Sequence, residues 1–194
     1  MAPKRKATEA EDAPVEAAAA PQAPSSGKLV VGQQFPQLGL LETDEESKID
    51  LSEVLKTHGL ILFFYPRANT PGCTAQACGM RDNLDSITKA GYKIFGMSAD
   101  KPKSQANWRA KHTFGYNLLC DPEGGSLKVL GVLKGPKSVS RSHIIVEKGG
   151  NVVLAEYGVS PKASIATVAA HVHGEKAEAA EAPAKAKPAK KAKA

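Results

Sequence analysis

The chain of 194 residues has few cysteines and aromatic residues and no long hydrophobic run. No apolar stretch approaches the roughly 18 residues of a membrane-spanning helix, and the N-terminus lacks the apolar core of a secretory signal peptide. We therefore expect a soluble, intracellular protein without membrane contact. The cysteines number three, and an odd number in a chain without a secretory signal argues for reduced, reactive thiols instead of structural disulfides.

Several enzyme motifs are also missing. The sequence contains no Gly-x-x-x-x-Gly-Lys-Ser/Thr, Gly-x-Gly-x-x-Gly or Gly-x-Ser-x-Gly, which removes the usual nucleotide-binding and serine-hydrolase hypotheses. It has no Cys-x-x-Cys pair, which weakens a disulfide reductase as an alternative. His171 and His173 near the C-terminus are too few ligands to indicate a metal site. We expect no bound metal or cofactor.

The two ends of the chain differ in composition from the middle. Residues 1–28 are rich in Ala, Pro and Glu and residues 174–194 in Lys and Ala, so neither segment can bury enough apolar surface to fold. We expect two disordered tails around one domain, residues 29–173. The basic cluster Pro3-Lys4-Arg5-Lys6 resembles a nuclear import signal, and half of the net charge of +6 lies in 174–194. This predicts a nuclear location, with the cytoplasm as a second compartment.

The same tails support an alternative function. Two basic segments could neutralise several phosphates and give weak, salt-dependent contact with nucleic acid. The alternative is therefore a nuclear, chromatin- or nucleic-acid-associated protein whose domain is only a scaffold.

The middle of the chain is organised around residues 60–82. Leu60–Tyr65 is an apolar and aromatic run typical of a buried strand, and Pro66 ends it. The turn residues 69–72 follow, with Pro71 suited to the first position of a helix. Cys73 then falls in the first helical turn, where unpaired amide groups and the helix dipole favour the thiolate.

The neighbours of Cys73 strengthen this interpretation. Thr70 has a hydroxyl that can donate to the sulfur, and Arg67 and Arg81 are close in sequence. Cys78 follows five residues after Cys73, which on an intact helix rotates the side chains by about 140° and separates the Cα atoms by about 8.7 Å. A disulfide needs less than about 7 Å. A bond between these cysteines would therefore require the helix to unwind.

The remaining sequence predicts alternating strands and helices. We expect the Cys73 helix to continue to about Ala90 with Gly91 as its cap, and Tyr92–Ser98 to close a right-handed βαβ unit. The other predictions are strands at Leu29–Val31, Leu118–Cys120, Ser142–Val146 and Val152–Tyr157, helices at Ser52–Lys56, Lys103–His112, Ser126–Leu130 and Ser164–His171, and a surface loop or hairpin at Glu42–Asp50. This order indicates a thioredoxin-like α/β fold with a central mixed sheet flanked by helices.

At residues 66–78 the chain resembles a known family. Pro66-x-x-x-Thr70-x-x-Cys73 matches the active-site motif of the peroxiredoxins, and Cys73-Thr-x-Gln-Ala-Cys78 resembles the atypical two-cysteine subgroup called peroxiredoxin Q, or bacterioferritin-comigratory protein. The resemblance extends over residues 29–171. Within this family the chain is similar to the fungal nuclear thiol peroxidases. The resemblance implies a peroxidase that reduces hydrogen peroxide and organic hydroperoxides, with thioredoxin as its reductant and without a cofactor. It also implies a monomer and an antioxidant role in cell redox homeostasis.

The resemblance also implies roles for individual residues. Cys73 would be the peroxidatic nucleophile, becoming a sulfenic acid, beside Pro66 and Thr70 of the motif. Arg141 matches the family's active-site arginine in Ser140-Arg141-Ser142, and Arg67 inside the motif is the competing candidate. The simpler alternatives are a buried structural thiol for Cys73 and a surface charge for Arg141.

Two cysteines compete for the second thiol role. The resemblance assigns Cys78 as the resolving cysteine, which would attack the sulfenic acid and form an intramolecular disulfide with Cys73. Cys120, at the end of a predicted strand, is its rival, although we expect it to be a buried core thiol.

Overall fold

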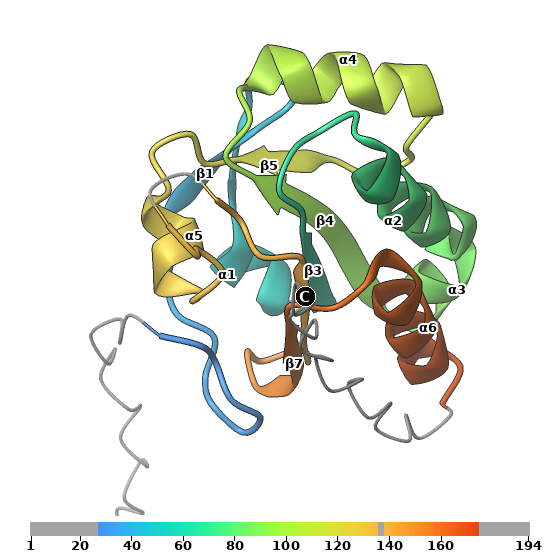
Figure 1. Ribbon diagram of the computed structural model, residues 1–194. Helices are drawn as coiled ribbons and strands as arrows, with labels where there is room; N and C mark the ends of the chain where they lie inside the picture. Colours follow the sequence, from blue (N-terminus) through green and yellow to red (C-terminus); the bar gives the residue numbers. More distant parts are fainter. Residues whose placement is uncertain (1–26, 136–137, 175–194) are drawn as a thin grey trace, which may run out of the picture.

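The sheet is built around β3 (Gly59–Phe64), in which six consecutive residues are buried. Its neighbours are β4 (Tyr92–Ser98), which is parallel to it, and β6 (Ser142–Val146), which is antiparallel. The other strands are β1 (Leu40–Thr43), β2 (Lys48–Asp50), β5 (Leu118–Cys120) and β7 (Val152–Tyr157), in the order β2-β1-β5-β4-β3-β6-β7 (Figure 1). This computed structural model describes residues 27–135 and 138–174.

Helices cover both faces of this mixed sheet. They are α1 (Leu51–Leu55), α2 (Pro71–Asp82), α3 (Leu84–Lys89), α4 (Pro102–His112), α5 (Gly125–Val129) and α6 (Pro161–Val172). Helices α2, α3 and α6 lie on one side of the sheet, α1 and α5 lie on the other, and α4 crosses one end (Figure 1). The mixed sheet with flanking helices confirms the predicted thioredoxin-like fold.

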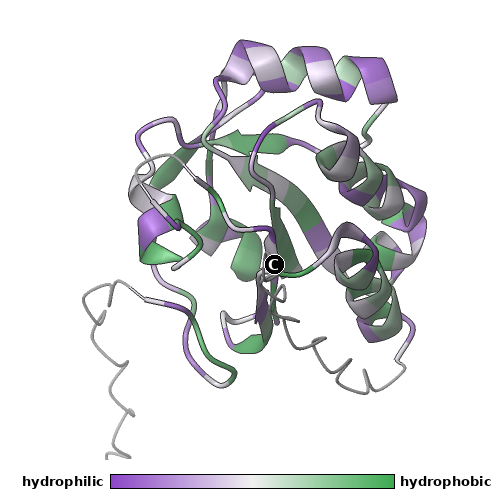
Figure 2. Ribbon diagram, in the orientation of Figure 1, coloured by the Kyte–Doolittle hydropathy of each residue, from purple (hydrophilic) through white to green (hydrophobic). Residues whose placement is uncertain are grey.

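Two hydrophobic cores follow from the alternation of side chains along β3. Leu60, Leu62 and Phe64 face α1 and α5, whereas Ile61 and Phe63 face α2 and α6. Figure 2 shows the hydrophobic residues concentrated in the central strands, while α4 is largely hydrophilic. A strand buried on both faces needs apolar residues at every position, which explains the uninterrupted run in the sequence.

Most predicted elements are found where the sequence placed them. The bounds of β4, β5, β6 and β7 agree with the prediction to the residue, and residues 42–50 form most of the β1–β2 hairpin. Trp108 of α4 is buried against the α2 side of the sheet, where it packs in the core.

The Cys73 helix ends earlier than predicted, which is a correction. It stops at Asp82, and Asn83 separates it from α3. Asn83 Nδ2 donates to the carbonyl oxygen of Gly79 at 2.8 Å, and its backbone leaves helical geometry with ψ 5°. An asparagine side chain competes for backbone partners in this way and interrupts the helix. Gly91, with φ +84°, ends α3 instead.

Two other elements differ from the prediction by more than one residue. Residues 29–31 form no strand, because Leu29 alone is buried and its amide donates to the hydroxyl of Tyr157, while Val30 and Val31 are exposed. Helix α6 begins at Pro161, three residues before the predicted start, because the hydroxyl of Ser160 accepts from the Ala163 amide and caps it.

The predicted tails fall almost entirely outside the described residues. Within the ranges that the structure describes, no helix is long and apolar enough to cross a membrane.

Candidate active site

A tight loop after β3 sets the start of α2. The amide of Ala68 donates to Asp100 Oδ2 at 2.7 Å, which ties the loop to the end of β4, and Asn69 takes a left-handed conformation with φ +57°. Thr70 is the N-cap in extended conformation and Pro71 is the first helical residue. The chain therefore reverses directly above the carboxyl end of β3 and points the N-terminus of α2 at this edge of the sheet.

Cys73 is the third residue of α2, and its side chain is almost fully buried, with the residue 1% exposed. The first intrahelical bond runs from the Thr74 amide to the Thr70 carbonyl at 2.8 Å, so the amides of Gly72 and Cys73 have no acceptor within the helix. The Thr70 side chain does not cap them. Two free N–H groups and the positive end of the helix thus lie next to the sulfur.

Arg141 contacts this sulfur from the other side. Its Nη2 donates to Cys73 Sγ at 3.3 Å, and its Nη1 donates to Gln76 Oε1 at 2.7 Å. Its carbonyl oxygen accepts from the amides of Gly158 and Val159 at 2.8 and 3.0 Å, which fixes the backbone just before β6. The predicted proximity of this arginine to the cysteine is found in the structure, although the two are 68 residues apart in sequence.

Gln76 and Ser164 are site residues that our sequence reasoning missed. Both are fully buried, and Gln76 Nε2 donates to Ser164 Oγ at 2.9 Å. The sequence did carry one signal for Gln76, since a polar residue three positions after Cys73 lies on the same helical face. No sequence pattern connects Ser164, on α6, to this site.

Other predicted contacts are not made. The Thr70 hydroxyl donates to the carbonyl of Arg67 at 3.1 Å and not to the sulfur, because the N-cap geometry turns it back toward the loop. Arg67 and Pro66 are exposed, and Pro66 directly follows the buried Tyr65. Arg81 is engaged elsewhere, with Asp82 and with the carbonyl of His112. Arg141 is therefore the arginine at the sulfur.

Cys78 lies further along the same unbroken helix. Both Cys73 and Cys78 are free thiols, and Cys78 is half-buried. The helix holds them about 8.7 Å apart at Cα, beyond the reach of a disulfide. Helix α6 packs closely against this part of α2, because a methyl group added at Gly79 would lie 2.3 Å from Ile165 Cδ1.

Cys120, the rival second thiol, is a core residue at the end of β5. It is 4% exposed, and its sulfur accepts from Gln105 Nε2 at 3.5 Å. Burial raises the pKa of the Cys120 thiol to about 12, so it remains protonated at neutral pH. A protonated thiol is a poor nucleophile.

Known proteins resemble this chain over most of its length. The model of the AhpC/TSA family matches residues 31–155. Peroxiredoxin bcp1 of Schizosaccharomyces pombe is 42% identical over 139 residues, which cover 71% of each chain.

Solved structures show the same fold. The crystal structure of peroxidoxin BcpB from Mycobacterium tuberculosis superposes with a TM-score of 0.70 at 26% identity, covering 76% of this chain and 98% of that one. Bacterioferritin comigratory protein of Xanthomonas campestris, studied for its alkyl peroxide reduction activity, gives a TM-score of 0.69 at 26% identity, covering 75% and 98%. The chain therefore belongs to the AhpC/TSA family, as a peroxiredoxin similar to the Bcp and peroxiredoxin Q proteins, and is a thiol peroxidase.

Proposed function

We propose that this peroxidase reduces hydrogen peroxide and organic hydroperoxides through Cys73 and is recycled by thioredoxin. The observation that carries the proposal is the 3.3 Å contact between Arg141 Nη2 and Cys73 Sγ at the N-terminus of α2. A guanidinium and the helix dipole together favour the thiolate, which is the nucleophilic form of the residue.

In the first step the Cys73 thiolate attacks the distal oxygen of the peroxide. A sulfur–oxygen bond forms and the oxygen–oxygen bond breaks, so sulfur loses two electrons and the peroxide gains them. The leaving oxygen departs as alkoxide or hydroxide and takes a proton to become an alcohol or water. The product on the protein is the Cys73 sulfenic acid.

The groups around the sulfur are suited to the charge that develops in this step. The Cys73 amide and the Arg141 guanidinium are donors for the oxygen that becomes negative. The Thr70 hydroxyl donates its hydrogen bond to the Arg67 carbonyl. The lone pairs of Thr70 Oγ1 can therefore accept a hydrogen bond from the peroxide O–H. We assign Thr70 this acceptor role in place of the expected bond to sulfur. Pro66 contributes by ending the strand ahead of the loop.

In the second step the Cys78 thiolate attacks the sulfenic sulfur. A disulfide forms and the sulfenic oxygen leaves as hydroxide, which is protonated to water. Because α2 is continuous through both cysteines, its first turns must unwind. This breaks the contact of Arg141 with the sulfur and its hydrogen bond with Gln76. The dithiol of thioredoxin then reduces the disulfide, and α2 refolds.

The substrate range rests on one neighbour. The solved bacterioferritin comigratory protein was studied for alkyl peroxide reduction, which supports organic hydroperoxides as substrates here. Comparing cumene hydroperoxide with hydrogen peroxide in the same assay tests this.

Peroxide consumption coupled to thioredoxin and NADPH tests the catalytic proposal. Cys73→Ser should abolish turnover, and wild-type turnover in that variant would contradict the proposal. Cys78→Ser should still be oxidised once by peroxide but should not cycle with thioredoxin. Cys120→Ser is the matched control and should cycle normally. Peptide mapping after one equivalent of peroxide should find the Cys73–Cys78 disulfide, and a Cys73–Cys120 bond would transfer the resolving role.

The alternative function, a nucleic-acid-associated protein whose domain is only a scaffold, has no support from the described residues or from the comparisons.

We do propose a nuclear location, on the basis of the Pro3–Lys6 cluster, which lies outside the described residues. Replacing Lys4, Arg5 and Lys6 with Ala in a fluorescent fusion should move the protein to the cytoplasm, and unchanged nuclear signal would contradict this. We also propose a monomer, which light scattering of the reduced protein tests.

A further inference from the structure

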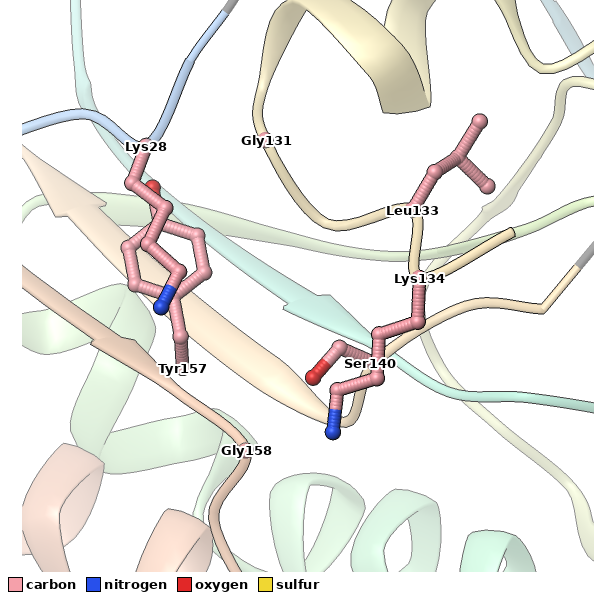
Figure 3. A pocket seen from close by; sticks show the side chains of 7 residues that line it. All are labelled: Lys28, Gly131, Leu133, Lys134, Ser140, Tyr157 and Gly158. Atoms are coloured by element: carbon pink, nitrogen blue, oxygen red, sulfur yellow. The ribbon is translucent and has the colours of Figure 1, made fainter.

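A pocket of about 250 Å³, seen from close by in Figure 3, is lined by residues other than those of the active site. Its walls come from Lys28, from the turn that holds Gly131 and Lys134, and from residues 157 and 158 at the end of β7. None of the side chains that contact Cys73 lines it. The pocket is thus a separate feature of the described part of the chain.

One wall is fixed by backbone contacts. Gly131 has φ +67°, and a side chain there would lie 2.5 Å from the backbone nitrogen of Lys28, so only glycine lets the two segments cross. The next residue, Leu29, is buried, and its amide donates to Tyr157 Oη at 2.7 Å. Lys28 Nζ lies 5.2 Å from the centre of the Tyr157 ring. These backbone contacts therefore place Lys28 at this wall, with its ammonium group over the Tyr157 ring.

The facing wall carries a second ammonium group and a hydroxyl. The Lys134 amide donates to the Ser138 carbonyl at 2.8 Å, and the Ser140 amide donates to the Val132 carbonyl at 2.7 Å, which forms a narrow hairpin. Lys134 Nζ and Ser140 Oγ each lie 4.0 Å from the point where a Cβ on Gly158 would be. They thus converge on a space that Gly158 leaves open, across the pocket from Lys28 and Tyr157 (Figure 3).

Three polar side chains of this pocket, those of Ser140, Lys28 and Lys134, lack a hydrogen-bond or ion-pair partner among the described residues. Ser140 is 6% exposed, yet its hydroxyl makes no hydrogen bond within those residues. Neither Lys28 nor Lys134 forms an ion pair with any carboxylate in the described ranges. A buried hydroxyl without a partner is destabilising, and a bound acceptor would remove that cost.

We propose that this pocket binds a small organic anion. Its oxyanion group, a phosphate or a carboxylate, accepts from Lys134 and Ser140, while Lys28 adds a second positive charge. Its organic part packs on the Tyr157 ring and on Leu133, since the pocket is larger than a lone oxyanion requires. Two lysines act as point charges, which suits an oxyanion without requiring a fixed bidentate geometry.

The backbone links this pocket to the active site. Ser140 directly precedes Arg141, and the amides of Gly158 and Val159 hold the Arg141 carbonyl. A ligand in the pocket therefore contacts the residues that fix the backbone of the catalytic arginine, without reaching Cys73.

Amide NMR of the full-length, reduced protein tests the binding directly. Phenyl phosphate and benzoate are the probes, and phenol is the uncharged control. We expect saturable shifts at Gly131, Lys134 and Gly158 with at least one of the anions, and none with phenol. The anion that binds more tightly identifies the head group. Shifts absent from these three amides at millimolar probe, or equal with phenol, would overturn the proposal.

Matched variants distinguish specific binding in this pocket from non-specific attraction of anions to a basic protein. Lys134→Gln and Ser140→Ala should each weaken binding of the anion by about tenfold or more. Lys103→Gln removes the same charge from an exposed position on α4 and should bind as the wild type does. The proposed binding site would be contradicted if Lys103→Gln weakened anion binding as much as Lys134→Gln does, or if Ser140→Ala bound the anion with wild-type affinity. Urea unfolding confirms that each variant is folded before it is titrated.

Discussion

Gln76 and Arg141 are joined by a hydrogen bond of 2.7 Å between Oε1 and Nη1, while Arg141 Nη2 donates to Cys73 Sγ. Because the guanidinium is planar, holding one terminal nitrogen also sets the position of the other. Gln76 and Cys73 lie on the same helix, so the sulfur and the support of its arginine are placed by one element. Unwinding α2 to form a disulfide would therefore dismantle the peroxide site at the same time.

Gln76→Ala should slow oxidation of Cys73 by hydrogen peroxide by about ten- to hundredfold, because Arg141 loses its support and the site loses its geometry. Rapid mixing with detection of Trp108 fluorescence measures this rate, since Trp108 Nε1 donates to Thr74, the neighbour of Cys73. Gln76→Glu keeps the acceptor oxygen and should recover part of the rate. The exposed Gln37→Ala should have no effect, and an unchanged rate in Gln76→Ala would show that Arg141 needs no support.

Arg141→Met should lower the same rate constant by about 10²–10³-fold, because it removes a donor to the developing negative charge. Arg141→Lys retains the charge but cannot donate from a planar fork to both Cys73 and Gln76, so we expect an intermediate rate. Arg67→Met is the matched control, since Arg67 is exposed within the motif and should be dispensable. A larger loss in Arg67→Met than in Arg141→Met would reverse the assignment.

Cys120 should not react in the native, reduced protein at pH 8, because burial raises its pKa to about 12. Mass spectrometry after treatment with iodoacetamide should find label on Cys78, which is half-buried, and not on Cys120. Labelling of Cys120 should appear only after unfolding in urea. Rapid labelling of Cys120 in the folded protein would contradict the burial argument.

The stability of the protein should fall when the pH drops below about 6.5. His143 on β6 is fully buried, both ring nitrogens lack a hydrogen bond among the described residues, and burial lowers its pKa from 6.5 to about 4. The unfolded chain therefore binds a proton between these pH values that the folded chain does not. This corresponds to at most about 3 kcal/mol lost as the pH falls through the window, because Glu156 Oε2 lies 3.5 Å from His143 Nε2 and would offset part of the cost of the charged imidazolium. His143 causes no loss above the window.

Urea unfolding at pH 7 and at pH 4.5 measures this effect. His143→Phe should reduce the difference between the two pH values, whereas His173→Phe, at an exposed position, should not. Some pH dependence should remain in His143→Phe because burial also lowers the pKa of His171. If His143→Phe and the wild type lose the same stability at pH 4.5, the buried imidazole is not the cause.

Gly79→Ala should destabilise the protein by about 1–3 kcal/mol although alanine favours helices, since the added methyl group would lie 2.3 Å from Ile165 Cδ1. Ile165→Ala removes the obstructing atoms but leaves a cavity. The double variant should therefore be more stable than the sum of the two single effects predicts, as urea unfolding would show. Strictly additive effects would mean that α2 and α6 do not meet at this point.

The sequence alone was sufficient for most of the fold. The buried strand, the turn after it and the position of Cys73 in the first helical turn follow from local rules on burial, proline and helix starts. The structure agrees with them, with the strand at Gly59–Phe64, one residue earlier than predicted, and the helix starting at Pro71. The break at Asn83 escaped prediction because it depends on one side chain capturing the Gly79 carbonyl instead of leaving it to the helix.

Which residues surround the sulfur was decided by the tertiary structure. Sequence patterns describe neighbours along a helix or a strand, so they placed Cys73 and Cys78 on one helix but could not bring Ser164 to Gln76 across 88 positions. The same limit applies to the direction of the Thr70 hydroxyl and to the pocket between Lys28 and Lys134. Such contacts depend on how α6, β7 and the loops pack against the sheet, and packing is set by the whole set of side chains at once.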